Sequence, residues 1–460
     1  MRCPVTLAVA LAAALLLAGV PENGVGTGRA AAAEQSKGRT AAAAATKVPR
    51  KTARPLDPLF AALAALQSGK AKAPVAIVQI GDSHSAGDFF SGRLRELFQE
   101  RFGAAGRGLL PPGIADKYYR PELVSVEQSA GWQRVRSADP QAEGPFGVAG
   151  IRQETAEAGE RMTLASSEDA GFDRVYLEVL RRPNGGTLKA SVDDGPEQII
   201  ATAGEHVSPS WIEIKAPERS HAVTLVTVGD GLVGLLSWGS ERRGPGVLYE
   251  NFGIIGATAD VMGRWDANSL ALEFAHQAPA LLIVAYGTNE SFMSAEDLDG
   301  YAESFAAHVR ALSETAPGAA VLVVGPPGIN RRYPRFVGAS GKCVPHVSAG
   351  AKALGSDVPI SPARKGRSVV WAPPPQLGAV LKDERAAAQK NGWFFWDWAH
   401  AMGGPCAMHQ WALRAEPLAQ PDHVHLHVSG YGLSAERLFA TLMAEYERYR
   451  ERQPRRAPGG

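Results

Sequence analysis

The sequence has little net charge, few cysteines and no apolar segment as long as a typical membrane span. Its 460 residues carry 48 lysines and arginines against 47 aspartates and glutamates, a formal net charge of +1. Nucleic-acid binding needs clustered positive charge, so this balance gives no support for a nucleic-acid partner. A hydrophobic content of 45% and a charged content of 21% are ordinary for a globular protein. The length predicts two folded domains.

An apolar run at the N-terminus is short for a membrane span and has the features of an export signal. It extends from Val5 to Val20 after Arg2, is broken by Pro21, and is followed by small residues up to Ala33. This order is typical of a secretory signal peptide cleaved near Ala33, and a retained anchor is the weaker alternative. We therefore expect a periplasmic or secreted protein whose mature form has no stable membrane span.

Cysteine is equally scarce, with three residues in the whole chain. Cys3 lies inside the predicted signal peptide and lacks the position of a lipoprotein cysteine, which leaves Cys343 and Cys406 in the mature protein. An even pair in an oxidising compartment favours one disulfide between two loops of the C-terminal half. Two separate buried thiols are the alternative.

Apolar segments of strand length alternate with helical patterns in two parts of the sequence. Residues 75–80 form a continuous apolar run, and apolar side chains then recur at helical spacing from Phe89 to Phe98. The alternation returns after residue 245, with strands predicted at 247–255, 280–285 and 320–325 and helices at 296–315, 376–390 and 430–450. This pattern predicts an α/β fold, a mostly parallel sheet with helices on both faces.

Between these two parts the sequence changes to short strands separated by turns. Segments 174–180, 187–192 and 222–228 alternate polar and apolar residues or are β-branched, and glycine-rich clusters lie between them. We expect an all-β sandwich or jelly roll inserted into the α/β domain. The predicted parts are a signal peptide at 1–33, a flexible linker at 34–55, an α/β domain at 56–117 and 246–450, the β insertion at 118–245, and a disordered tail at 451–460.

The first of four motifs at predicted strand ends is Gly81-Asp82-Ser83-His84. Open parallel sheets bind ligands beyond the carboxyl ends of their strands. A serine on a tight strand-to-helix turn exposes its hydroxyl there, with its amide at a helix N-terminus that favours negative charge. Alone, the motif is equally a helix cap in which Asp82 or Ser83 accepts an amide hydrogen bond.

The second and third motifs supply candidate donors to a developing oxyanion. Gly256 follows a predicted strand and opens a helix, and a glycine there lets the backbone amide approach such an anion closely. Asn289, in Gly287-Thr288-Asn289-Glu290, could donate its side-chain amide to the same charge. Each motif taken alone is more simply a turn or a cap.

The fourth motif is the histidine-rich segment from Asp422 to His427. His425 is a candidate general base for Ser83, and Asp422 is spaced to orient its imidazole within one loop. A rival interpretation is a metal site, because His423, His425 and His427 alternate and would share one face of a strand. Since no cysteine or acidic cluster completes a ligand set, we predict neither a metal nor another cofactor.

Taken in order, the four motifs resemble the conserved blocks of the SGNH/GDSL hydrolase superfamily. The resemblance implies a three-layer flavodoxin-like α/β fold with a mainly parallel sheet. It implies a serine esterase whose catalytic triad is Ser83, Asp422 and His425. The amides of Ser83 and Gly256 and the side chain of Asn289 would then form the oxyanion hole.

Two departures from the usual superfamily blocks point to a subgroup. His84 stands where leucine is commoner, and Glu290 stands where aspartate is more usual. With the all-β insertion, these residues resemble periplasmic peptidoglycan O-acetylesterases, whose insertion is similar to a carbohydrate-binding jelly roll. The resemblance implies removal of O-acetyl groups from a cell-envelope polysaccharide, peptidoglycan foremost, through an acyl-enzyme on Ser83. The alternatives are an O-acetyltransferase with the same triad, hydrolysis of other esters or lipids, and an inactive glycan-binding protein.

Aromatic residues are the candidates for binding glycan outside the catalytic centre. In the insertion they are Trp132, Tyr176, Trp211 and Trp238. A second group, Trp393, Trp396, Trp398 and Trp411, precedes the Asp422 motif. Packing in the core is the commoner role for such residues, and we expect it for most of them.

Overall fold

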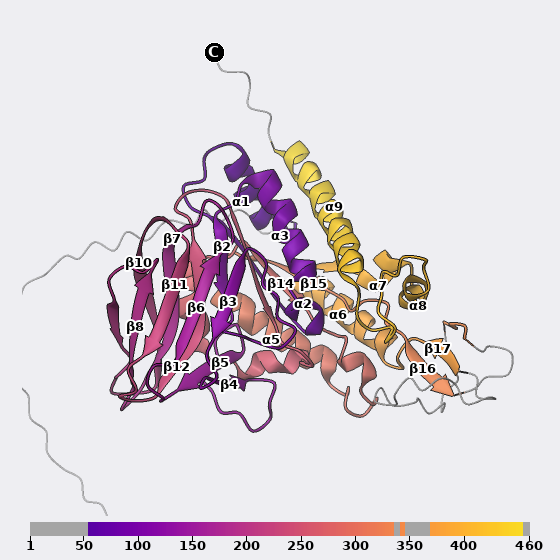
Figure 1. Ribbon diagram of the computed structural model, residues 1–460. Helices are drawn as coiled ribbons and strands as arrows, with labels where there is room; N and C mark the ends of the chain where they lie inside the picture. The colour runs from indigo at the N-terminus through magenta and orange to yellow at the C-terminus, as the bar shows by residue number, and fades with distance from the viewer. Residues whose placement is uncertain (1–53, 335–340, 346–368, 454–460) are drawn as a thin grey trace, which may run out of the picture. The chain divides into compact units, whose positions relative to one another are not determined.

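The computed structural model describes residues 54–334, 341–345 and 369–453 (Figure 1). The predicted signal peptide, nearly all of the predicted linker and most of the predicted tail lie outside these residues. Within the described ranges, no helix combines the length and the apolar character needed to cross a membrane.

A five-stranded parallel sheet forms the centre of the α/β part (Figure 1). Its strands lie in the order β13 (Val247–Gly253), β1 (Val75–Gly81), β14 (Leu281–Ala285), β15 (Ala320–Val324) and β18 (Phe394–Trp396). All four pairings are parallel, and Gly81 lies opposite both Gly253 and Ala285. The carboxyl ends of β13, β1 and β14 therefore meet at one edge, and the predicted parallel sheet is confirmed.

Helices cover both faces of this sheet and complete three layers. On one face, α1 (Asp57–Gln67), α3 (Phe89–Phe102) and α9 (Val428–Arg452) pack against Val75 and Ile77 of β1. On the other face, α4 (Ala267–Gln277), α5 (Tyr301–Thr315) and α6 (Leu377–Asn391) pack against Val78 and Ile80. Because side chains alternate along a strand, a strand buried on both faces is mostly apolar, as β1 is apart from Gln79. The buried Gln79 side chain is hydrogen-bonded to Ser85 and Tyr249.

One predicted helix starts later than the sequence pattern suggested. α5 begins at Tyr301 rather than at residue 296, because Ser294 and Asp297 close a separate turn through two mutual hydrogen bonds. From Tyr301 the buried side chains recur at helical spacing, and the stripe includes Phe305 and Val309. The segment expected to be helical after residue 258 is a 3₁₀-helix, η1 (Ala259–Arg264).

The inserted segment forms two antiparallel sheets. The six-stranded sheet has the order β10 (Ser208–Ser220), β7 (Phe172–Arg181), β12 (Val233–Glu241), β5 (Ile151–Thr155), β4 (Gln133–Arg136), with β2 (Gly106–Leu110) also paired to β12. The five-stranded sheet has the order β3 (Val124–Gln128), β6 (Arg161–Ser166), β11 (Ala222–Thr227), β8 (Thr187–Val192), β9 (Gln198–Ala201). Apolar side chains from both sheets share one core, as in a β-sandwich. β2 lies ahead of the predicted boundary at residue 118.

Most aromatic candidates in the insertion are packing residues. Trp238 is fully buried and donates its indole N–H to the Pro111 carbonyl, while Trp132 and Tyr176 are 6% and 2% exposed. Tyr176 and the partly buried Trp211 lie 4.1 and 4.5 Å, between ring centroids, from His276 of α4. These two aromatics therefore join the insertion to the α/β part.

Short elements complete the α/β part of the described chain. They are α2 (Ser83–Ala86) after β1, η2 (Glu290–Phe292), the hairpin of β16 (Arg331–Pro334) and β17 (Val369–Ala372), α7 (Trp398–Met402) and α8 (Ala407–Ala412). The predicted disulfide between Cys343 and Cys406 is present. Trp396, Trp398 and Trp411 are buried, as expected for core residues, and Trp393 is partly buried.

Candidate active site

Ser83 is the first residue of α2, directly after the end of β1. Asp82 caps this short helix, since its side chain accepts a hydrogen bond from the His84 amide at 2.9 Å. The helix cap that the motif allowed is therefore real, but Asp82 makes it and the Ser83 hydroxyl bonds elsewhere. α2 lies so close to β13 that a Cβ atom on Gly253 would come within 2.1 Å of the Ala86 nitrogen, which explains the glycine.

The structure brings the three predicted triad residues together. Ser83 Oγ lies 3.0 Å from His425 Nε2, and His425 Nδ1 lies 2.7 Å from Asp422 Oδ2. The other carboxylate oxygen, Asp422 Oδ1, accepts the amides of Val424 at 2.9 Å and of His425 at 3.0 Å. A proton on Nδ1 would leave Nε2 free to accept the serine proton, which is the arrangement that a general base needs.

Electrostatics favour a charged Asp422 beside the imidazole. Burial alone would raise the pKa of Asp422, but hydrogen bonds from the His425 ring and from two amides outweigh it and lower the pKa to about 2. Burial alone would lower the pKa of His425. The hydrogen bond to Asp422 and the charge of that carboxylate outweigh burial and raise the pKa of His425 above its ordinary value. Asp422 therefore favours the protonated, imidazolium form of His425.

His84 lies beside the imidazole of His425, with 5.4 Å between the two ring centroids. Its Nδ1 is 3.0 Å from the Tyr431 hydroxyl, and its ring packs edge-on against Trp398. Burial, and then the charge of His425, lower the pKa of His84 to about 3. His84 is therefore neutral at neutral pH and adds no second positive charge next to His425.

The two remaining predicted donors follow β13 and β14, the two strands that flank β1. Gly256 is exposed after β13 and has φ +77°, in the left-handed region that favours glycine. Asn289 follows β14, and its Nδ2 donates to the Ala257 carbonyl at 2.7 Å. An amide group carries two hydrogens, so this bond orients Asn289 and leaves one hydrogen for a ligand.

Comparisons with known proteins support this fold. No family model and no curated protein matches the chain. A solved structure titled "Peptidoglycan O-acetylesterase in action, 5 min" is similar over 85% of this chain and 96% of its own, with a TM-score of 0.67 and 24% identity. The chain therefore shares the fold of that structure, and in this chain the fold is a three-layer α/β domain with an inserted β domain. A family two carbohydrate esterase from Cellvibrio japonicus covers 70% of this chain and 99% of its own at 13% identity, but its TM-score of 0.25 is too low to support an argument.

Glu290 connects the two loops that carry Gly256 and Asn289, a role that the sequence did not reveal. Its buried carboxylate accepts the Ala259 amide at 2.7 Å and the Gly287 amide at 3.0 Å, and so joins the loop after β13 to the loop after β14. Burial raises the pKa of Glu290 to about 7, against the lowering effect of these amides. The only sequence signal for Glu290 was its departure from the aspartate usual in this block.

The alternative of a metal site on three alternating histidines is wrong in its geometry. His423, His425 and His427 lie in a loop of turns and not on a strand, so they share no strand face. His423 has φ +58° and packs on Trp371, while His427 is the N-cap residue of α9. Over the described residues, no group of three or more histidine, cysteine or acidic side chains is arranged to hold a metal ion.

A buried ion cluster stands behind the nucleophile helix. Asp88, two residues after α2, pairs with Arg95 at 2.8 Å and Arg107 at 3.1 Å, and all three side chains are at most 1% exposed. Burial would raise the pKa of Asp88, but the two guanidinium groups outweigh it and lower the pKa to about 2. The cluster ties α3 and β2 to the turn that carries Ser83.

Proposed function

We propose that the chain is a serine esterase that removes O-acetyl groups from a cell-envelope polysaccharide, with peptidoglycan as the substrate. The observation that carries this proposal is the continuous set of hydrogen bonds from Ser83 through His425 to Asp422. The fold shared with a structure described as a peptidoglycan O-acetylesterase supports the choice of substrate.

In the proposed reaction, His425 Nε2 takes the proton of Ser83 Oγ as the oxygen attacks an acetyl carbonyl. The bond that forms joins Oγ to the carbonyl carbon, and the carbonyl oxygen becomes an oxyanion. Asp422 holds Nδ1–H and stabilises the imidazolium without taking its proton. These steps use only contacts already present in the structure.

The oxyanion would be held by the amides of Ser83 and Gly256 and by the side chain of Asn289. His425 then protonates the sugar oxygen as it leaves, which produces an acetyl-enzyme on Ser83. Water activated by the same imidazole releases acetate and restores the serine. Glu290 acts in this scheme as a positioning residue, because it fixes the loops that carry two of the three donors.

The assembled triad argues against the inactive glycan-binding alternative. A protein that had lost catalysis would have no need to keep Ser83, His425 and Asp422 within hydrogen-bonding distance. Transfer of the acetyl group to a sugar would use the same groups and differ only in the acceptor. Product analysis with and without an acceptor glycan separates hydrolysis from transfer.

The proposed location is the periplasm or the extracellular space. The Cys343–Cys406 disulfide fits an oxidising compartment, as does a substrate in the cell envelope. The N-terminal sequence pattern supports export, with cleavage near Ala33. Sequencing the N-terminus of the protein recovered from the periplasm or medium tests this part of the proposal.

The function is tested by acetate release from O-acetylated peptidoglycan and from an aryl acetate. We expect release from both substrates and its loss in Ser83→Ala. Ser85→Ala is the matched control, because Ser85 lies in the same short helix but accepts a hydrogen bond from Gln79 rather than contacting His425. Ser85→Ala should keep turnover, and folded wild-type protein that releases no acetate from either substrate would contradict the proposal.

A further inference from the structure

His423 is the conformationally unusual residue of the triad loop. It stands directly after Asp422 and two residues before His425, and its φ of +58° is uncommon for a residue with a side chain. This left-handed turn lets the chain fold back so that Asp422 reaches the amides of Val424 and His425. Two separate sets of contacts converge on His423.

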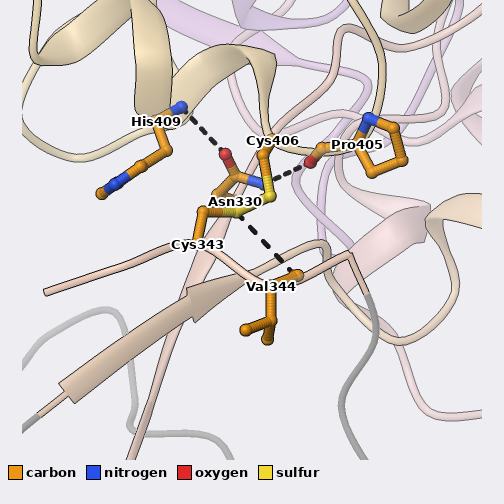
Figure 2. Close-up of a disulfide and its surroundings, with 6 residues drawn as sticks. All are labelled: Asn330, Cys343, Val344, Pro405, Cys406 and His409. Atoms are coloured by element: carbon orange, nitrogen blue, oxygen red, sulfur yellow. Dashed lines mark hydrogen bonds between the residues drawn. A yellow bond between two sulfur atoms is a disulfide. The ribbon is translucent and has the colours of Figure 1, made fainter. Parts of the chain in front are cut away.

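The first set of contacts runs through Asn330. The Asn330 amide donates to the His423 carbonyl at 2.9 Å. Its side chain, which is buried, accepts the His409 amide at 2.9 Å and donates to the Pro405 carbonyl at 2.7 Å (Figure 2). Asn330 thereby ties the triad loop to the turn that precedes α8, where Cys406 is located.

The second set of contacts runs through Trp371 of β17. The His423 ring lies 3.5 Å from the Trp371 ring, measured between centroids. The Trp371 backbone pairs with the residues on either side of Cys343, since its amide donates to Lys342 and its carbonyl accepts from Val344, both at 2.9 Å. Trp371 thus ties the other side of the triad loop to Cys343.

The disulfide joins the two sets of contacts. Figure 2 shows the disulfide between Cys343 and Cys406 beside the Asn330–Pro405 hydrogen bond. Because Cys343 belongs to the segment paired with Trp371, the disulfide closes a ring of contacts around His423. We call Asn330, Trp371, Cys343 and Cys406 the His423 frame. Burial, and then the neighbouring His409, lower the pKa of His423 to about 4, so its ring is neutral and packs as an aromatic.

We propose that the His423 frame positions the catalytic base: it holds His423 in its left-handed conformation and thereby fixes Asp422 and His425 against Ser83. His423 and the frame residues are positioning residues, since they touch neither substrate nor reacting atoms. The inference rests on the proposed function for its kinetic readout and adds a covalent support, far from Ser83 in the chain, to the triad.

Two changes open the frame at different points. Cys343→Ser together with Cys406→Ser removes the covalent closure, and Trp371→Ala removes the ring on which His423 packs. Since a small displacement of a catalytic group costs up to about 100-fold in rate, we expect kcat to fall about 10-fold in the first variant and about 10- to 100-fold in the second. KM should stay within about twofold, because the frame does not hold substrate.

Conservative and remote variants separate positioning from general destabilisation. Trp371→Phe keeps an aromatic face and should retain kcat within about threefold of the wild type. Phe172→Ala removes a buried side chain from the core of the insertion, away from the triad loop. It should lower the melting temperature without lowering kcat at temperatures where the protein is folded.

The titration of His425 provides a readout that does not require turnover. The groups that face this imidazole are Asp422, Asp82 and His84, and none of them is changed in the variants. A loosened Asp422–His425 bond should lower the pKa of His425 toward its ordinary value, as seen by NMR with the signal assigned from His425→Gln. The same fall should appear in the pH profile of kcat/KM.

The outcomes separate this inference from the proposed function. An inactive wild type whose His425 pKa still falls in both frame variants would sink the esterase proposal and keep the frame. An unchanged His425 pKa in both variants would overturn the frame, as would kcat within twofold of an active wild type. Equal losses of kcat in Phe172→Ala would also overturn it, because the effect would then be one of stability.

Discussion

Ser83 and His425, the proposed nucleophile and base, are held by different kinds of structure. Ser83 stands on a strand-turn-helix unit whose cap, Asp82, is its neighbour in sequence. His425 stands in a loop without helix or strand, and its partner Asp422 has a side chain that is 44% exposed. One half of the site is fixed by regular secondary structure, and the other by individual hydrogen bonds and ring contacts.

This difference indicates where each half is vulnerable. The strand and helix around Ser83 use many equivalent backbone contacts, so a change in the helix cap at Asp82 should leave turnover nearly unchanged. The loop around His425 depends on a few individual hydrogen bonds, chiefly those of Asp422. Replacement of one carboxylate oxygen in this loop should therefore lower turnover strongly. The following predictions test this contrast, from the largest expected effect to the smallest.

The same substitution at two aspartates gives the sharpest comparison. In Asp422→Asn, an amide replaces the carboxylate that holds His425 Nδ1–H, and we expect kcat to fall about 10,000-fold through the wrong tautomer. In Asp82→Asn the cap remains, because asparagine caps helices as well as aspartate, and kcat should stay within about threefold. Steady-state kinetics with an aryl acetate measure both.

Circular dichroism should show both proteins folded. A comparable loss of kcat in the two variants would mean that Asp82 also acts in catalysis and that the contrast is wrong. Asp82→Asn is a demanding control for Asp422→Asn, because the Asp82 side chain is buried. Burial raises the pKa of Asp82 to about 6, against the lowering effect of hydrogen bonds from His84 and Thr288.

The ion cluster behind Ser83 should be the most sensitive point for stability. Asp88→Ala would leave Arg95 and Arg107 buried without their carboxylate, and we expect a loss of about 3–5 kcal/mol in the free energy of unfolding. Denaturant unfolding measures it. The exposed pair Arg93–Glu96 is the control, since Glu96→Ala should cost less than about 1 kcal/mol. Equal losses of unfolding free energy in Asp88→Ala and Glu96→Ala would show that the buried cluster does not stabilise the turn after α2.

Removal of the proposed side-chain oxyanion donor should affect turnover and leave folding intact. In Asn289→Ala we expect kcat to fall about 100- to 1,000-fold, the usual cost of losing one such donor. Asn391→Ala is the matched control, because Asn391 also donates to a backbone carbonyl, that of Ala387, but at the end of α6. Near-normal turnover of folded Asn289→Ala would remove Asn289 from the site.

The smallest effect is on pH dependence, and its sign follows from His425. The base must be neutral, so kcat/KM should rise with pH through the raised pKa of His425, above its ordinary 6.5. The stabilisation that protonated His425 gains from Asp422 is present below pH 6.5 and lost as pH rises through the folded pKa. The contribution of Asp422 is present above pH 3.8 and lost as pH falls toward 2. A pH profile centred below 6.5 would contradict this assignment.

The sequence predicted the parts of this molecule that depend on local pattern. Continuous apolar runs such as 75–80 identified the parallel strands, because a strand buried on both faces has no polar alternation. The four motifs predicted Ser83, Gly256, Asn289 and the Asp422–His425 pair as site residues, because each lies on a short segment with a fixed order. The structure places Ser83, His425 and Asp422 within hydrogen-bonding distance of one another. Cysteine parity was enough to pair Cys343 with Cys406.

The parts that could not be predicted depend on contacts between distant segments. Nothing local in the sequence shows that Glu290 accepts an amide from the loop after another strand, or that His423 packs on Trp371. The alternation of three histidines allowed a shared strand face as a rival interpretation, whereas left-handed backbone at His423 turns the chain instead. Similarly, the sequence of β2 does not show which sheet the strand joins, because that depends on its pairing with the distant strand β12.

The paired ends of the insertion have a consequence for how the chain folds. β1 and β13 are neighbours in the central sheet, yet residues 82–246 separate them, and such non-local pairing is slow because the intervening chain must first be closed. β2 pairs with β12, with Gly106 opposite Glu241, so a folded insertion brings the ends of β1 and β13 together. We therefore expect the β insertion to fold first and to bring β13 next to β1. The strand β1, which precedes Ser83, can then pair only after the whole insertion and β13 have been synthesised or exported.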